Sequence, residues 1–546
     1  MIICQRKGIR FLLLTLGGVL TGLTLVFPSI GFLEWLTLIP AGLFLLEYAT
    51  RSEVRLRTLY GYGLFFFYCY YLVVYHWFVN LYPLDFIDGM TKGAAVCVVL
   101  VSWWGLALLQ ALMGGVVFVL MGTFFRTSLA RRVPLLRPFL AAGIWSVFEW
   151  SQTLGWWGVP WGRLPLGQSS YLLGLQTASW FGSYFVTFLL VAVNLCLAQG
   201  VIIVLRRYEI PLRHSLKPIG IAVAAMLVFQ YGAGAVIWLT NRDEGEPLRV
   251  AAIQGNISSN EKWSFSSAKR TQEVYREHTL RAAEQGAELV VWPETALPYE
   301  LEEGNSSWVY VSSLAKEADV MILVGAFDPS ENEKEGEYNA VFCFLPDGNC
   351  LDTVYAKRKL VPFGEFVPLR GLIETLIPPL AELVMSGDDV LWGEGANLFE
   401  TEKGTIGSLI CFDSIYEDLT RESVLEGAEL ICLSTNDSWF TDSAALYMHN
   451  AQAQLRAIES GRYVVRCANT GISTIISDRG EVLSSLEPLV DGMVVEDVYR
   501  SDHRTLYTLI GNLFVFLWIA ILLLLAALEI ILWIRKKKWV KNMTVV

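Results

Sequence analysis

The sequence predicts two kinds of structure in one chain: a multi-span α-helical membrane bundle and an extracytoplasmic α/β domain. Only 17% of the residues are charged, against roughly 25% in soluble proteins, and the mean hydropathy is +0.44. Eight apolar stretches have a length suited to crossing a bilayer. Between the last two of them, short apolar runs alternate with amphipathic stretches, a pattern that is typical of a layered α/β domain.

The apolar stretches are each near the ~20 residues that a spanning helix needs. They lie at residues 11–27, 30–48, 59–79, 93–124, 137–151, 171–204, 217–239 and 508–534. The first is predicted to be a span and not a cleaved signal peptide, because no small-residue cleavage site follows it. We therefore expect three parts: a membrane domain at 1–240, an extracytoplasmic domain at 241–506, and a last span with a basic tail at 507–546.

Basic residues alternate from one set of loops to the next. Five segments are rich in Lys and Arg, namely 6–10, 51–57, 126–137, 206–217 and 535–541. The intervening short loops hold only Lys92 and Arg163. Under the positive-inside rule, this pattern predicts that both termini are cytoplasmic and that the polar block faces the outside.

Two features of the bundle suggest more than anchoring, although each has a simpler interpretation. The outer loop at 155–163 is rich in Trp, Gly and Pro, as expected of either an aromatic belt at the interface or a substrate contact. Glu149 is costly in hydrocarbon, so we expect it to face the bundle interior or the interface.

An apolar insert at 370–400 interrupts the polar block. It is either an ordinary packed helix or a mobile arm at the bilayer surface.

The polar block contains buried strands and amphipathic helices in alternation. The predicted strands are 248–254, 288–292, 320–326, 340–345, 406–411 and 429–434. The predicted helices are 267–285, 306–318, 415–427 and 445–460. Several strands are continuously apolar, which indicates that both of their faces are buried.

Charge and cysteine content exclude some classes of function. The net charge of −11 argues against a nucleic-acid partner, because phosphate binding needs a basic face. Nine cysteines occur without a CxxC pair, so no zinc site and no dense disulfide framework is predicted. Cys343 and Cys350 flank a hairpin-like turn, and whether they pair depends on geometry.

Reactive side chains follow several of the predicted strands, where layered α/β domains usually build their sites. Glu294 comes just after the strand 288–292. Lys357 and Glu365 stand on either side of an apolar turn. Cys411, with Asp413 two residues later, ends the strand 406–411, which is where a nucleophile would lie. Alone, Cys411 would more often be a small core residue.

Acid, lysine and cysteine in this chain order resemble the carbon–nitrogen hydrolase (nitrilase) superfamily. The resemblance implies an α-β-β-α sandwich with Glu294 as general base, Lys357 as the lysine and Cys411 as nucleophile. The chemistry is coherent, because a nearby cation lowers the pKa of a thiol while a carboxylate takes its proton. Lys357 would then stabilise the tetrahedral oxyanion.

Further motifs narrow the resemblance to the apolipoprotein N-acyltransferase family of the bacterial envelope. They lie at 292–298, 360–369, 435–440, 456–473 and 505–512. The resemblance implies supporting roles for Glu365, Trp439 and Trp263. The family usually has Tyr then Glu after the nucleophile, where this chain has Phe412 and Asp413, so their supporting roles are expected to be shifted or weaker.

The resemblance implies acyl transfer from a phospholipid, through a cysteine thioester, to the N-terminal amine of a diacylglyceryl-cysteine lipoprotein. The partners would be the phospholipid donor, the lipoprotein acceptor and membrane lipid, with no metal or organic cofactor. The location implied is the bacterial inner membrane, with the catalytic domain facing the periplasm. Two alternatives remain: a membrane-tethered amidase or nitrilase-type hydrolase, and a non-catalytic scaffold with a degraded triad.

Overall fold

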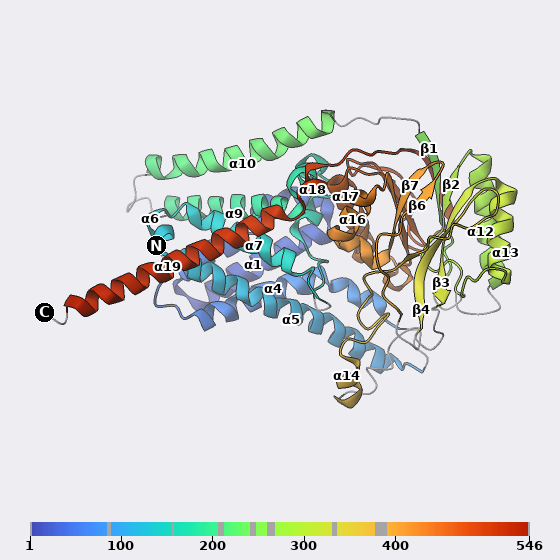
Figure 1. Cartoon of the computed structure of the whole chain (residues 1–546). Helices are drawn as coiled ribbons and strands as arrows, with labels where there is room; N and C mark the ends of the chain where they lie inside the picture. Colours follow the sequence, from blue (N-terminus) through green and yellow to red (C-terminus); the bar gives the residue numbers. More distant parts are fainter. Residues whose placement is uncertain are drawn as a thin grey trace. The chain divides into compact units, whose positions relative to one another are not determined.

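The chain forms two compact units in the computed structural model. The first contains Met1–His76, Leu100–Trp238 and Ile510–Val546, and the second contains Trp77–Val99 and Leu239–Leu509. The structure describes residues 3–84, 89–155, 158–205, 212–240, 247–258, 268–329, 336–376 and 390–543. Figure 1 labels the helices and strands.

The first unit is helical. Its longer helices are α1 (Lys7–Val26), α4 (Leu56–Val74), α5 (Lys92–Phe125, which starts in the second unit), α7 (Leu136–Ser151), α9 (Ser183–Leu205), α10 (Leu212–Thr240) and α19 (Leu513–Met543). Its shorter helices are α2 (Glu34–Thr37), α3 (Ile39–Phe44), α6 (Ser128–Arg132) and α8 (Ala178–Phe181). Within this unit α1 packs along α4, and α7 packs along α9.

Six stretches of the described helices are long and apolar enough to cross a membrane. They are Lys7–Val26, Pro28–Ala49, Lys92–Phe125, Ser183–Leu205, Leu216–Thr240 and Leu513–Lys537. The two other predicted spans, 59–79 and 137–151, correspond to α4 with 19 residues and α7 with 16. The prediction of several apolar helices in this part of the chain is therefore confirmed.

Two predicted spans begin later than the apolar pattern suggested. In the stretch 171–204, the long helix starts only at Ser183, after Gly182 with a φ of +79°. In the stretch 508–534, α18 (Leu506–Ile510) ends before Gly511 and α19 starts at Leu513. Apolar residues continue through both breaks, so hydropathy alone does not mark them, whereas a left-handed φ, which glycine adopts readily, ends the helix.

Glu149 lies inside the first unit with 2% of its surface exposed. Its Oε1 accepts hydrogen bonds from the Trp145 indole at 3.1 Å and the Leu164 backbone N–H at 3.0 Å. Its Oε2 accepts from the Thr187 hydroxyl at 2.5 Å. The expectation that this acid faces the bundle interior is met, and three donors compensate for its burial.

The second unit contains two six-stranded sheets. The first has the order β12-β1-β2-β3-β4-β5, with β1 (Pro247–Gln254), β2 (Leu289–Val291), β3 (Met321–Pro329), β4 (Glu337–Phe344), β5 (Tyr355–Ala356) and β12 (Gly492–Tyr499). The second has the order β11-β10-β9-β8-β7-β6, with β6 (Phe399–Thr401), β7 (Gly404–Ile410), β8 (Leu430–Thr435), β9 (Val464–Ala468), β10 (Thr474–Ile476) and β11 (Val482–Ser485).

Parallel strands form the centre of each sheet. β1, β2 and β3 are parallel to one another in the first sheet, as are β7, β8 and β9 in the second. The register places Val291 opposite Leu323 and Ile410 opposite Ser434. The carboxyl ends of parallel neighbours lie at one edge, so the residues that follow β7 and β8 emerge side by side.

Two apolar clusters hold these layers together. One joins residues of both sheets, among them Val250, Leu323, Ile410 and Cys432. The other joins the opposite face of the first sheet to α12 (Ala268–Glu284) and α13 (Ser306–Ala318). The helices α16 (Glu417–Glu426) and α17 (Ala444–Ser460) pack against strands of the second sheet. Figure 1 shows the two helix pairs on opposite sides of the strands.

The predicted α/β architecture of this part of the chain is confirmed. The six predicted strands correspond to β1–β4, β7 and β8, and the four predicted helices to α12, α13, α16 and α17. Strands β5, β6 and β9–β12 were not predicted. The apolar insert at 370–400 begins with α14 (Arg370–Leu376), on which Leu372 is 55% exposed, while its segment 377–389 lies outside the described residues.

Cys343 and Cys350 are both free thiols in the structure. Cys343 is buried in the core between the sheets, whereas Cys350 packs against the cluster on the helical face. The two side chains therefore belong to different faces of the first sheet. Their backbones are nevertheless close, because Cys350 forms an isolated β-bridge with Phe344 at the end of β4. This geometry opposes a disulfide between them.

We therefore expect both thiols to be reduced in the purified protein. Alkylation of the chain after denaturation without reductant, followed by mass spectrometry, would show carbamidomethyl groups on Cys343 and Cys350 in full yield. A peptide pair linked through these two residues would contradict the observed strand geometry.

Candidate active site

Three charged side chains meet at the ends of strands in the second unit. Glu294 lies three residues after β2, Lys357 directly follows β5, and Glu365 lies in the turn beyond it. The strand β2 is apolar and fully buried, so the chain runs through the core there and leaves the strand shortly before Glu294. The backbone N–H of Lys357 donates to the Asn339 carbonyl at 2.8 Å, which holds the lysine beside β4.

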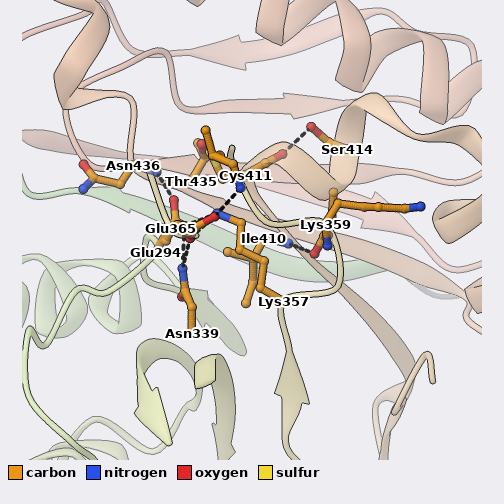
Figure 2. Close-up of polar contacts among 12 residues, drawn as sticks. Glu294, Asn339, Lys357, Lys359, Glu365, Ile410, Cys411, Ser414, Thr435 and Asn436 are labelled. Atoms are coloured by element: carbon orange, nitrogen blue, oxygen red, sulfur yellow. Dashed lines mark hydrogen bonds and ion pairs between the residues drawn. The ribbon is translucent and has the colours of Figure 1, made fainter. Parts of the chain in front are cut away.

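Lys357 is shared by the two carboxylates, as Figure 2 shows. Its Nζ donates to Glu294 Oε1 at 2.8 Å and to Glu365 Oε1 at 2.8 Å. The remaining oxygens also have donors. Glu294 Oε2 accepts from the Asn436 backbone N–H at 2.8 Å, and Glu365 Oε2 accepts from the Val361 backbone N–H at 2.8 Å. This reacting cluster (Glu294, Lys357 and Glu365) is thus well supplied with hydrogen bonds.

The ion pairs of this cluster lie in a buried environment, where charges interact more strongly than in water. Lys357 is 1% exposed and Glu294 is 5% exposed. Burial by itself would lower the pKa of the Lys357 ammonium, but the two carboxylates raise that pKa well above its usual value. Lys357 is therefore a permanent cation in the site. Removing either carboxylate would leave a less compensated buried charge.

Asn339 is a member of the site that the sequence did not single out. Its Nδ2 donates to Glu294 Oε1 at 2.7 Å and to Glu365 Oε1 at 3.2 Å, so it bridges the two acids opposite the lysine. It is 4% exposed and lies in β4. In the sequence Asn339 directly precedes the apolar run of β4, and nothing there distinguishes it from a polar residue at a strand end.

Cys411 stands at the end of β7, where the strand passes into a short 3₁₀ helix at Cys411–Ile415. Its φ is +47°, a left-handed conformation that costs about 1–2 kcal/mol for a residue with a Cβ. Figure 2 shows the residue beside the reacting cluster together with Thr435. A strained residue that points a nucleophilic group at a charged cluster is a common feature of active sites.

The thiol of Cys411 is protonated at rest. Burial and the negative charge of Glu294 raise its pKa well above the usual value, although Lys357 and a hydrogen bond with the Thr435 side chain act in the opposite direction. Lys357 lowers this pKa, as the sequence analysis expected. The net shift of the pKa is nevertheless upward, because the effect of burial is larger than that of the cation. A base is required to form the thiolate, and Glu294 is the carboxylate beside it.

Asp413 lies outside the reacting cluster and has a different task. It is fully buried, and its Oδ1 accepts from the backbone N–H groups of Lys359 at 2.7 Å and Arg358 at 3.2 Å. Its Oδ2 accepts from the Tyr355 hydroxyl at 2.9 Å and the Ile410 N–H at 3.1 Å. The carboxylate thus ties the cysteine turn to the segment that carries Lys357.

The other predicted supporting residues are placed as follows. Phe412 is 8% exposed, and its ring packs edge-on against Tyr416 with centroids 5.5 Å apart. Trp439 lies in a 3₁₀ turn at Ser438–Phe440, three residues after Asn436. Trp263 lies outside the described residues. The structure therefore brings Glu294, Lys357, Glu365 and Cys411 together and gives Phe412 a packing contact.

This arrangement is suited to acyl transfer through a covalent intermediate. A thiol, a carboxylate and a cation lie beside one another in a mostly buried site, as a nucleophile, a base and an oxyanion-stabilising charge would have to. Among the described residues, no group of three or more His, Cys, Asp and Glu side chains is placed to hold a metal ion. The fold and the site together are those of the carbon–nitrogen hydrolase class of enzymes.

Comparison with known proteins agrees with this class. The family model for carbon–nitrogen hydrolases matches residues 249–507, and that for the apolipoprotein N-acyltransferase N-terminal domain matches residues 17–196. Apolipoprotein N-acyltransferase from Gloeobacter violaceus is 31% identical over 95% of this chain and 94% of its own. That from Geobacter metallireducens is 30% identical over 95% of both chains. The chain belongs to the apolipoprotein N-acyltransferase family, which confirms the resemblance noted in its motifs.

Solved structures of the nitrilase superfamily also align with part of the chain. An amidase from Nesterenkonia sp. AN1 covers 47% of this chain and 93% of its own, with 16% identity and a TM-score of 0.37. The Nit3 protein of Saccharomyces cerevisiae covers 47% of this chain and 92% of its own, with 19% identity and a TM-score of 0.37.

The raised pKa of Asp413 predicts how the stability of the fold depends on pH. Burial raises the pKa of its carboxyl from 3.8 to about 6, although Lys357 and the hydrogen bonds from Ile410, Lys359 and Tyr355 oppose the rise. The folded chain therefore takes up this proton at a higher pH than the unfolded chain, and this group favours the folded state increasingly as the pH falls from 6 towards 4. At about 1.4 kcal/mol per pKa unit, the effect is at most about 3 kcal/mol.

We expect the parent to gain stability relative to Asp413→Asn as the pH is lowered from 7 to 4. The measurement is the difference in melting temperature between parent and variant in detergent at each pH, in which the other carboxylates cancel. A difference that stays constant over this range would show that Asp413 does not titrate there.

Proposed function

We propose that the chain is an N-acyltransferase that moves an acyl chain from a phospholipid to the N-terminal amine of a diacylglyceryl-cysteine lipoprotein. The single observation that carries the proposal is the cluster of Glu294, Lys357 and Cys411 in a carbon–nitrogen hydrolase domain. Two lipid substrates suit a chain with several helices long and apolar enough to cross a membrane. Membership of the apolipoprotein N-acyltransferase family supports the same activity.

The first half-reaction forms a thioester. Glu294 accepts the thiol proton of Cys411, and the thiolate attacks the ester carbonyl of the phospholipid. The ammonium of Lys357 stabilises the tetrahedral oxyanion, and a single preorganised donor of this kind contributes roughly 3 kcal/mol. When the C–O bond breaks, Glu294 returns the proton to the leaving alkoxide. The products are a lysophospholipid and an acyl group on Cys411.

The second half-reaction forms an amide. The free amine of the lipoprotein attacks the thioester carbonyl, and Glu294 takes a proton from the attacking nitrogen. The C–S bond then breaks, and the thiolate of Cys411 is protonated again. An amide is more stable than a thioester, so the second step is downhill. Because the lysophospholipid leaves before the amine reacts with the acyl-enzyme, the kinetics are ping-pong. The reaction as proposed requires no metal ion and no organic cofactor.

The remaining residues have supporting roles in this proposal. Glu365 holds Lys357 from the side opposite Glu294, and Asp413 positions the loop that carries the lysine. Phe412 supports the cysteine turn through its contact with Tyr416. Trp439 and Trp263 are proposed to contact substrate, on the strength of the family motif.

The placement in the membrane belongs to the same proposal. We propose eight spans, in which α4 and α7 join the six stretches that meet the criteria of length and composition. The domains would be a membrane domain at 1–240, a periplasmic catalytic domain at 241–506 with its layers as an α-β-β-α sandwich, and a last span with a basic tail at 507–546. The alternation of basic loops supports a bacterial inner-membrane protein with both termini in the cytoplasm.

The thioester gives the first test. Incubated with phospholipid alone, the parent is expected to acquire an acyl group on Cys411 that hydroxylamine removes, because hydroxylamine cleaves thioesters. Cys411→Ser should acquire no thioester, and Cys97→Ser is the matched control, since Cys97 is an exposed thiol on α5. If the parent forms no such adduct, acyl transfer through Cys411 is wrong.

A diacylated lipopeptide distinguishes transfer from hydrolysis. Added to the acyl-enzyme, it should be converted to the triacylated product, with a mass gain of one acyl chain. Release of free fatty acid with no triacylated product would indicate a membrane-tethered hydrolase instead.

A further inference from the structure

A buried polar network lies behind the nucleophile and takes no part in the chemistry proposed above. It consists of Ser414, Asp437, His449 and Arg466, and we call it the histidine network. Each of the four side chains is at most 1% exposed. They come from the turn after β7, the segment after β8, the helix α17 and the strand β9.

The inner end of the network fixes Asp437. Its Oδ2 accepts from Arg466 Nη2 at 2.6 Å. Its Oδ1 lies 3.0 Å from His449 Nδ1 and accepts from the Thr435 hydroxyl at 3.1 Å. Because both carboxylate oxygens are engaged by neighbours that are themselves buried, the imidazole of His449 is held in one orientation.

The outer end of the network reaches the backbone of the nucleophile. His449 Nε2 lies 3.2 Å from the Cys411 carbonyl oxygen and 3.0 Å from Ser414 Oγ. Ser414 Oγ donates to the same carbonyl at 2.7 Å. In the tautomer that carries its N–H at Nε2, His449 donates to this carbonyl oxygen, and its Nδ1 accepts from Arg466 Nη2 at 3.2 Å. Two side chains therefore hold the peptide plane that follows Cys411.

Holding this plane maintains the unusual conformation of Cys411. Its φ of +47° is unfavourable by about 1–2 kcal/mol and persists only if surrounding contacts require it. Rotation of the released peptide plane would let Cys411 return to a negative φ. That change redirects the bond from Cα to Cβ and takes the sulfur away from Glu294 and Lys357.

We propose that His449 is a positioning residue for the nucleophile: it transmits the fixed orientation of Asp437 to the Cys411 carbonyl and so aims the thiol at the reacting cluster. The inference rests on the proposed function, in which Cys411 carries the acyl group. A buried, charged network usually stabilises a fold less than apolar packing of the same volume would. Its cost is explained if it orients a reacting atom.

Two variants of His449 separate its contact with Asp437 from its contacts with the turn that carries Cys411. In His449→Gln the longer side chain can place an amide N–H near the position of Nε2 and keep the bond to the Cys411 carbonyl. In His449→Asn the shorter amide lies near the position of Nδ1 and keeps only the contact with Asp437. His278→Gln is the matched control, because His278 is 4% exposed on α12 and contacts Asp491 at 3.5 Å, away from the site.

The first readout is the rate at which iodoacetamide alkylates Cys411, followed by mass spectrometry of its peptide in the full-length protein in detergent. We expect His449→Asn to alkylate about 10- to 100-fold more slowly than the parent, since misplacement by about 1 Å can cost 100-fold. His449→Gln should stay within about threefold of the parent, and His278→Gln should match it. Equal rates for the Gln and Asn variants would overturn the proposal.

The second readout is the rate of acyl-adduct formation at increasing phospholipid concentration. His449→Asn should lower the maximal rate and leave the half-saturating concentration unchanged, because His449 acts on the backbone of Cys411 and is not proposed to bind the lipid. A rise in the half-saturating concentration with an unchanged maximal rate would overturn the positioning role. Alkylation needs no lipid, so a parent that forms no adduct refutes the proposed function while the alkylation rates still test His449.

Ser414→Ala covers the case in which the His449 variants do not fold. It removes the shorter of the two bonds to the Cys411 carbonyl and substitutes a small buried side chain. We expect alkylation of Cys411 to slow by about 10-fold or more. Alkylation at the parental rate in a folded Ser414→Ala protein would overturn the proposal.

Discussion

The ammonium of Lys357, shared between the carboxylates of Glu294 and Glu365, is the interaction on which the site depends. Two acids and one cation in a mostly buried volume leave an excess negative charge, and buried charge is stable only when it is paired and hydrogen-bonded. Asn339 and the backbone N–H groups of Asn436 and Val361 provide the further donors. Because these donors come from separate strands and loops, the cluster can form only when both sheets are assembled.

The two sheets are joined at this point by contacts that carry the reactive residues. The Ser434 hydroxyl at the end of β8 donates to the Trp292 carbonyl at 2.9 Å, two residues before Glu294. Asp413, from the cysteine turn, accepts hydrogen bonds from the segment that carries Lys357. Glu294 and Lys357 thus follow strands of the first sheet, whereas Cys411 follows a strand of the second. Small shifts between the sheets would change the geometry of the reaction itself.

The electrostatics of the site favour a thiol that is inert until substrate is present. Burial and Glu294 keep Cys411 protonated, whereas Lys357 remains charged because its two acids outweigh the cost of its own burial. The carboxylate that suppresses the thiolate is the same group that is proposed to accept its proton.

The sequence by itself determined the helical and α/β parts of the chain, the strand ends and the order Glu294, Lys357, Cys411, because apolar runs and their limits are local properties. It also carried the family motifs. Only the tertiary structure decided that Asn339 and His449 belong to the site, since their partners lie 45 and 38 residues away. It likewise decided that Asp413 ties two loops together, and that Cys343 and Cys350 lie on different faces of a sheet. Hydrogen bonds between distant segments leave no periodic pattern in a sequence, and burial, which sets the pKa of Cys411, arises only when the layers pack.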